Sequence, residues 1–219
     1  MGSVLGDLLP LAVGVAISPI PIVAAILMIL SSNASGSGTG FALGWVAGIA
    51  VATTVFVALS GLSGGSGDRE PSTAASWVKV GLGVVLLALA VSQWRKRSDE
   101  QPPGWMRAID ELTTGKAVGL GLLLSAVNPK NLLLCVSAGV TIGSSSLDAG
   151  GKSVAVVVFT VLAAASVLVV ILGYAVAADR LRESLDATRR WLQSNNHAVM
   201  AIVLLVMGAV VIGKGVGGL

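Results

Sequence analysis

The stretch "AVNPKNLL" holds the residues of this chain best suited to do chemistry: Asn128, Pro129, Lys130 and Asn131. A proline lacks the backbone N–H and clashes with the preceding helical turn, so it interrupts a helix and leaves carbonyl oxygens without donors. The amide and ammonium groups beside it can donate hydrogen bonds to those oxygens or to a ligand. Within an apolar segment, freed backbone groups need such a partner or a water-lined cavity. The motif therefore indicates either a ligand site or a kink that the protein itself fills.

A second motif of this kind, "AISPIPIV", supplies Ser18, Pro19 and Pro21. Each motif is followed by a nearly uncharged connection rich in Ser and Gly, "SSNASGSGTG" after one and "IGSSSLDAGG" after the other. This correspondence indicates a weak internal repeat. Interrupted helices in two related halves are typical of the binding sites of secondary transporters. We therefore predict one substrate-binding site made from both motifs: Ser18, Pro19, Pro21, Asn128, Pro129, Lys130 and Asn131.

Lys130 is the strongest single indication of function. It lies roughly 20 Å along a helix that would begin near Ala117, and a lysine at a helix centre costs on the order of 2.5–3.5 kcal/mol on insertion scales. No acidic residue lies inside any other predicted span. Lys130 therefore contacts freed carbonyls and water, binds an anionic group, or is uncharged. We expect it to face an internal polar cavity beside the Ser18–Pro21 break and to serve transport more than folding.

The composition places both motifs in a membrane protein. Of 219 residues, 54% are hydrophobic and 11% are charged, whereas a soluble domain carries roughly 25% charged residues. We predict an all-α membrane protein with six transmembrane helices, arranged as an inverted 3+3 repeat with helices 1 and 4 broken. Residues 1–219 would form a single transmembrane domain, with one repeat at about 1–95, a cytoplasmic connection at 95–116 and the second repeat at about 117–219. The predicted spans, each able to cross about 30 Å of hydrocarbon, are Leu8–Leu30, Gly40–Leu62, Ala75–Trp94, Ala117–Thr141, Lys152–Ala177 and Ala198–Gly218.

The positive charges predict the orientation. One side of the membrane would carry the connections 31–39, 95–116 and 178–197, and with them Arg95, Lys96, Arg97, Arg107, Lys116, Arg180, Arg182, Arg189 and Arg190. The other side would carry Arg69, Lys79, Lys152 and Lys214. The positive-inside rule makes the first side cytoplasmic. We therefore expect a multi-pass protein of the inner (plasma) membrane, with both termini outside the cytoplasm and the first apolar run retained as a helix.

Aromatic and amphipathic patterns indicate contact with the membrane surface. Trp45, Trp77 and Trp94 are expected to anchor at the interface. The connections within 104–117 and 179–196 place Leu and Trp opposite charged residues. That pattern favours short amphipathic helices at the headgroup level, with solvated loops as the alternative.

Several classes of protein are excluded or disfavoured. The single Cys135 and the single His197 exclude a disulfide framework and a Cys/His metal cluster within one chain. No nucleotide-binding loop is present, and no cluster of His, Asp and Glu lies in the spans. We therefore expect no enzyme activity, no cofactor and no nucleic-acid partner. The expected partners are membrane lipids, an anionic lipid or small-molecule substrate, and either a second copy of the chain or a larger lipid-export complex.

Four motifs resemble the lysine exporter (LysE) superfamily: "SPIP", "GW" in the second span, "NPKNLLL" and "WLQSNN" before the sixth span. Within it the chain is most similar to the Gap/Sap group of actinobacterial glycolipid-addressing proteins. The resemblance covers nearly the whole chain. It implies a six-helix membrane protein that takes part in exporting glycopeptidolipids or sulfolipids, with the residues of both motifs as the functional positions. Amino-acid exporters of the superfamily usually have Gly where this chain has Ile20, which argues against a small amino acid as substrate.

Three functions from different classes follow as hypotheses. The first is export of a lipid-linked or amphipathic, glycolipid-type substrate to the cell surface. The second is export of a small solute, amino acid or ion by the same architecture. The third is assembly of the cell envelope without transport. A lipid carrier should open sideways to the bilayer, whereas a solute carrier should enclose an aqueous pocket.

Overall fold

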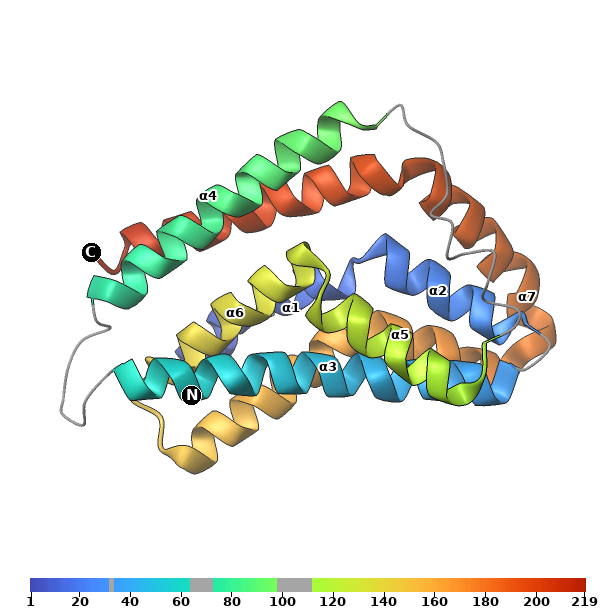
Figure 1. Ribbon diagram of the computed structural model, residues 1–219, viewed down its shortest axis with the longest axis horizontal. Coiled ribbons are helices and arrows are strands. Elements are labelled where there is room, and N and C mark those ends of the chain that lie inside the picture. Colours follow the sequence, from blue (N-terminus) through green and yellow to red (C-terminus); the bar gives the residue numbers. More distant parts are fainter. Residues whose placement is uncertain (32–33, 64–72, 98–111) are drawn as a thin grey trace.

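Helices account for the secondary structure of the part of the chain that the computed structural model describes, residues 1–31, 34–63, 73–97 and 112–219 (Figure 1). No strand occurs in these ranges. The helices are α1 (Gly2–Ala16), α2 (Pro19–Ile29), α3 (Ala34–Ser63), α4 (Thr73–Arg95), α5 (Thr114–Ala126), α6 (Pro129–Gly143) and α7 (Ala149–Val216).

Both predicted interruptions are confirmed. Helices α1 and α2 meet at an angle of 55°, and α5 and α6 meet at 65°. In each pair the second helix begins with a proline, Pro19 or Pro129. A proline is well tolerated in the first turn of a helix, where its missing N–H would have no partner, but it cannot continue the helix before it. The prolines therefore divide two long apolar segments at their centres.

The helices support four to six membrane spans. Within the part of the chain that the structure describes, four segments are long and apolar enough by themselves: Gly36–Ser60, Ser76–Arg95, Ala149–Ala178 and Arg180–Val216. The number rises to six if each bent pair counts as one span. The last two segments belong to α7, which is interrupted only by the non-helical backbone of Ala177.

The predicted amphipathic segment at 179–196 is helical but is not a separate element, because it continues into the last span within α7 (Figure 1). Leu192 on this segment is buried, and Leu185 packs against the core. Trp191 is 58% exposed, as an interface anchor would be. The other predicted amphipathic segment lies mostly outside the described residues.

Each bent pair packs against a helix from the other half of the chain. Helices α5 and α6 lie along α3, and α1 and α2 lie along α7, while α4 pairs mainly with α7 (Figure 1). Glycines allow the closest crossing: a Cβ on Gly44 of α3 would come within 2.0 Å of the carbonyl oxygen of Val118 on α5. A Cβ on Gly121 would meet the carbonyl oxygen of Phe41 at 2.5 Å. Small residues thus bring the backbones together, as is usual between membrane helices.

The tryptophans divide between surface and core. Trp77 and Trp94 are 61% and 49% exposed, as expected of interface residues. The expectation for Trp45 is wrong, because its side chain is fully buried and stacks on Phe41 at a centroid distance of 6.3 Å. The reason is the position of α3, which α5, α6, α2 and α7 all contact.

Candidate functional site

The break between α1 and α2 leaves several backbone carbonyls at the C-terminal end of α1 without their helical N–H donors. In a continuous helix, the carbonyl of Val15 would accept from the N–H of residue 19, and the carbonyl of Ile17 from the N–H of residue 21. Both of these positions are proline, which has no N–H. The N–H of Ser18 turns to the carbonyl of Ala16 at 2.9 Å, so the carbonyl of Gly14 also loses its helical donor. These oxygens form the negative end of a helix dipole inside the protein.

Lys130 supplies donors to this helix end. Its ammonium donates to the carbonyl of Gly14 at 2.6 Å and to that of Ile17 at 3.1 Å. The Lys130 side chain is buried, with 2% exposure for the residue. A cation at a helix C-terminus is favourable, which explains how a lysine is accommodated here without a carboxylate. An ammonium carries three N–H donors, so two carbonyls leave one donor for another acceptor.

Asn131 joins the two breaks. Its side-chain NH₂ donates to the carbonyl of Leu124 at 3.1 Å, an oxygen that α5 leaves free where it ends. Its side-chain oxygen accepts from the hydroxyl of Ser18 at 3.0 Å. Ser18 and Asn131 are both essentially inaccessible. The hydroxyl of the first motif and the amide of the second are therefore in direct contact.

The remaining predicted site residues shape the backbone. Asn128 is the N-cap of α6, since its side chain accepts from the N–H of Lys130 at 3.1 Å. Pro19 and Pro21 are buried, whereas Pro129 is exposed. The structure thus brings Ser18, Lys130 and Asn131 together, while Pro129 lies at the edge of the group.

Ser166 contributes to the site although it lies outside both sequence motifs. The hydroxyl of Ser166 on α7 donates to the carbonyl of Ala16 at 2.7 Å, so a third element supports the end of α1. The only signal in the sequence was a serine within an apolar span, and such residues usually join helices.

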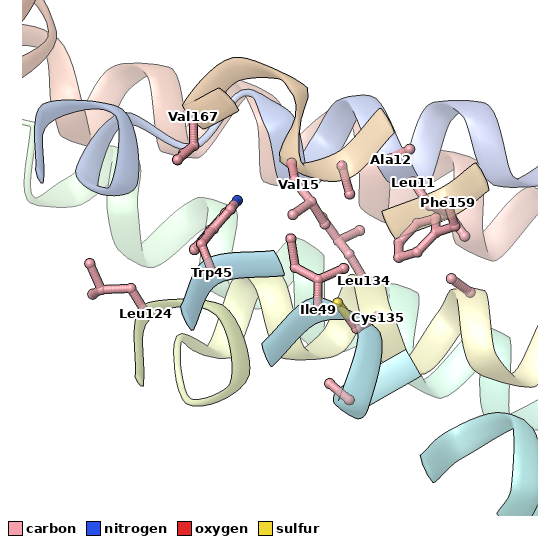
Figure 2. Close-up of a cluster of buried hydrophobic side chains, with 14 of the residues drawn as sticks. Leu11, Ala12, Val15, Trp45, Ile49, Leu124, Leu134, Cys135, Phe159 and Val167 are labelled. Atoms are coloured by element: carbon pink, nitrogen blue, oxygen red, sulfur yellow. The ribbon is translucent and has the colours of Figure 1, made fainter. Parts of the chain in front are cut away.

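Buried apolar side chains lie on the same helices as the polar group. Leu11, Ala12 and Val15 of α1 gather with Leu134 of α6 and Phe159 of α7 (Figure 2). A hydrogen bond within such a low-dielectric surround is stronger than one in water. Among the described residues no group of three or more His, Cys, Asp or Glu could hold a metal ion. The Lys130 ammonium and the Asn131 amide each keep one N–H donor beyond the hydrogen bonds above, and such donors suit an acceptor-rich or anionic partner.

A comparison with protein families gives a match over nearly the whole chain. The model of the family described as Sap, sulfolipid-1-addressing protein matches residues 8–217. Comparison with curated proteins and with solved structures gives no match.

Proposed function

The chain belongs to the Sap, sulfolipid-1-addressing protein family, and from this premise we propose that it takes part in exporting an anionic lipid-linked or amphipathic substrate. The observation that carries the proposal is the buried ammonium of Lys130 where two bent pairs of apolar helices meet. A sulfate, phosphate or carboxylate group would form a charge-assisted hydrogen bond there, stronger than a neutral one.

The same contacts suggest how binding is coupled to movement. Lys130 on α6 holds carbonyls at the end of α1, and an anionic headgroup would compete with these carbonyls for the ammonium. Binding would then loosen the contact between the two bent pairs. Because their interrupted backbone has no continuous ladder of hydrogen bonds to break, the bends are the parts of the fold that can change angle at least cost.

An inverted repeat underlies this proposed mechanism. When Pro19 is aligned with Pro129, two backbone hydrogen bonds before the breaks correspond. The Ile17 N–H donates to the Val13 carbonyl in the first half, and the Val127 N–H donates to the Leu123 carbonyl in the second. The bond from Ile22 to Ser18 likewise corresponds to that from Leu132 to Asn128. The reciprocal packing of each bent pair against the other half supports the same relationship. With three spans per copy, the second copy would be inverted, as in many secondary transporters.

We place the protein in the plasma membrane, with the Arg-rich end of α4 and the basic middle of α7 on the cytoplasmic side. Both termini would then lie outside the cytoplasm. The partners proposed with this arrangement are the bilayer lipids, the anionic substrate, and a second copy or a larger export complex. No enzymatic step is part of the proposal.

The test compares Lys130→Met and Lys130→Arg with the parent, at matched amounts of protein in the membrane. The readout is the amount of an anionic glycolipid delivered to the cell surface. We expect export to fall at least tenfold for Lys130→Met and to recover only in part for Lys130→Arg, whose larger planar group has a different donor geometry. Gly119→Ala is the matched control on the neighbouring helix α5, since a Cβ there meets nothing within 4 Å. Export by Lys130→Met at the parental level would make Lys130 a structural cap only.

The same variants separate the alternatives. A small-solute exporter would lose efflux of that solute while glycolipid delivery stayed unchanged. An assembly factor without transport would lose glycolipid delivery in cells but show no lipid movement in vesicles that contain only the purified chain. The proposed exporter moves lipid in both settings.

A further inference from the structure

Three charged residues from three helices lie near one another, about 10 Å along α1 from the Gly14 carbonyl that Lys130 contacts. Lys214 of α7 forms an ion pair with Asp7 of α1, at 3.0 Å between the ammonium and the carboxylate. The same ammonium donates to the main-chain carbonyl of Asp7 at 2.6 Å. Lys79 of α4 lies within electrostatic range of both residues. Two lysines and one aspartate thus share this end of the molecule.

The packing of α4 against α7 fixes the two lysines. A Cβ on Gly215 would lie 2.9 Å from the N atom of Val80 and 2.9 Å from the carbonyl oxygen of Ser76. The hydroxyl of Ser76 also donates to the carbonyl of Gly218 at 2.9 Å. Because Lys79 and Lys214 directly precede Val80 and Gly215, this close backbone contact puts the two lysines on adjoining turns of packed helices.

The charges in this group do not balance. Asp7 provides one negative charge, and it is paired with Lys214. No hydrogen bond or ion pair to Lys79 is present in the described part of the chain, although this side chain is partly buried. Asp7 attracts Lys79 and Lys214 repels it less strongly, but one carboxylate balances only one of the two lysines, whose like charges still repel each other. A second anion placed between them would relieve this repulsion.

We infer that Asp7, Lys79 and Lys214 form a second binding site, which takes the sulfate, phosphate or carboxylate of an anionic lipid headgroup. The Lys214 and Asp7 side chains are 25% and 50% exposed, so the group is accessible from outside the helices. It lies near the ends of membrane spans, where headgroups are found. The two ammonium groups bind the anion, and Asp7 competes with it for Lys214. This site is separate from Lys130 and does not require the chain to transport.

The experiment measures lipid binding, so it is independent of export. The full chain is placed in nanodiscs of phosphatidylcholine, and binding of phosphatidylglycerol or of a sulfated galactolipid is measured by native mass spectrometry. The variants are Lys79→Gln, Lys214→Gln and Asp7→Asn. The control is Lys152→Gln, which removes a lysine that donates to the carbonyl of Gly143 instead. Thermal unfolding establishes that each variant is folded.

We expect Lys79→Gln and Lys214→Gln each to weaken binding about tenfold, the loss of one charge-assisted contact, and Lys152→Gln to bind as the parent does. Asp7→Asn should bind more tightly, because the competing carboxylate is gone. Tighter binding of phosphatidylglycerol identifies a resident phospholipid as the ligand, and tighter binding of the sulfated lipid identifies a substrate-like ligand. Parental binding by Lys79→Gln, or weaker binding by Asp7→Asn, would overturn the proposal and leave a structural ion pair.

Discussion

Lys130 of α6 donates to the carbonyl oxygen of Gly14 at 2.6 Å, so a charged residue from the second half of the chain caps the broken helix of the first half. The proline that begins α6 places Lys130 in the first turn of that helix. The break at the prolines that begin α2 leaves the carbonyls that Lys130 contacts without helical donors. The two motifs are therefore complementary: one provides acceptors and the other provides donors.

The stability of Lys130→Met should stay within about 2 kcal/mol of the parent. Burying the ammonium is unfavourable by on the order of 2.5–3.5 kcal/mol, and each carbonyl left without its donor is unfavourable by about 1–3 kcal/mol, so the two effects of the substitution oppose each other. Thermal unfolding in detergent measures the difference. A loss well above 3 kcal/mol would mean that Lys130 acts mainly in folding.

Ser18 and Asn131 should be energetically coupled. Ser18→Ala and Asn131→Leu each remove the hydrogen bond between them, so the double variant should lose less stability than the two single losses combined. The expected coupling is about 0.6 kcal/mol and at most about 1.7 kcal/mol, the range found for hydrogen bonds between membrane helices. Additive losses in a double-mutant cycle would show that the contact contributes nothing.

Gly44→Ala should destabilise the crossing of α3 and α5. The added Cβ would lie 2.0 Å from the carbonyl oxygen of Val118, which is backbone and cannot rotate away. We expect a loss of about 1–3 kcal/mol, typical of overpacking. Gly119→Ala on α5 is the control, because its Cβ meets nothing within 4 Å. That variant should be neutral or more stable, since alanine favours a helix over glycine by up to about 1 kcal/mol.

Labelling of intact cells should report the proposed orientation. In a Cys135→Ala background, Ser146→Cys in the connection before α7 should react with a membrane-impermeant maleimide. Ser184→Cys on the basic segment of α7 should react only after the membrane is opened. Both native serines are exposed, so access to the side chain does not limit either reaction. The opposite labelling pattern would reverse the topology.

Composition and residue order were sufficient to predict apolar helices and the two proline breaks, but not that α7 continues from Ala149 to Val216 with its interruption at Ala177. An apolar run long enough to cross a bilayer must be helical, because a helix satisfies its own backbone groups. A central proline interrupts such a run wherever it lies. For this reason the breaks before Pro19 and Pro129 could be located from the sequence, and so could the polar residues beside them.

Only the tertiary structure decided what those residues contact. Asn131 reaches the Ser18 hydroxyl, and Ser166 reaches the end of α1, across more than 100 positions of sequence. Such contacts depend on which helices pack against each other. The packing surfaces of membrane helices are so uniformly apolar that the sequence pattern does not determine these helix pairs. The burial of Trp45 cannot be predicted from the sequence for the same reason. A tryptophan suits both an interface and a packed core, and only the helices that surround α3 decide between them.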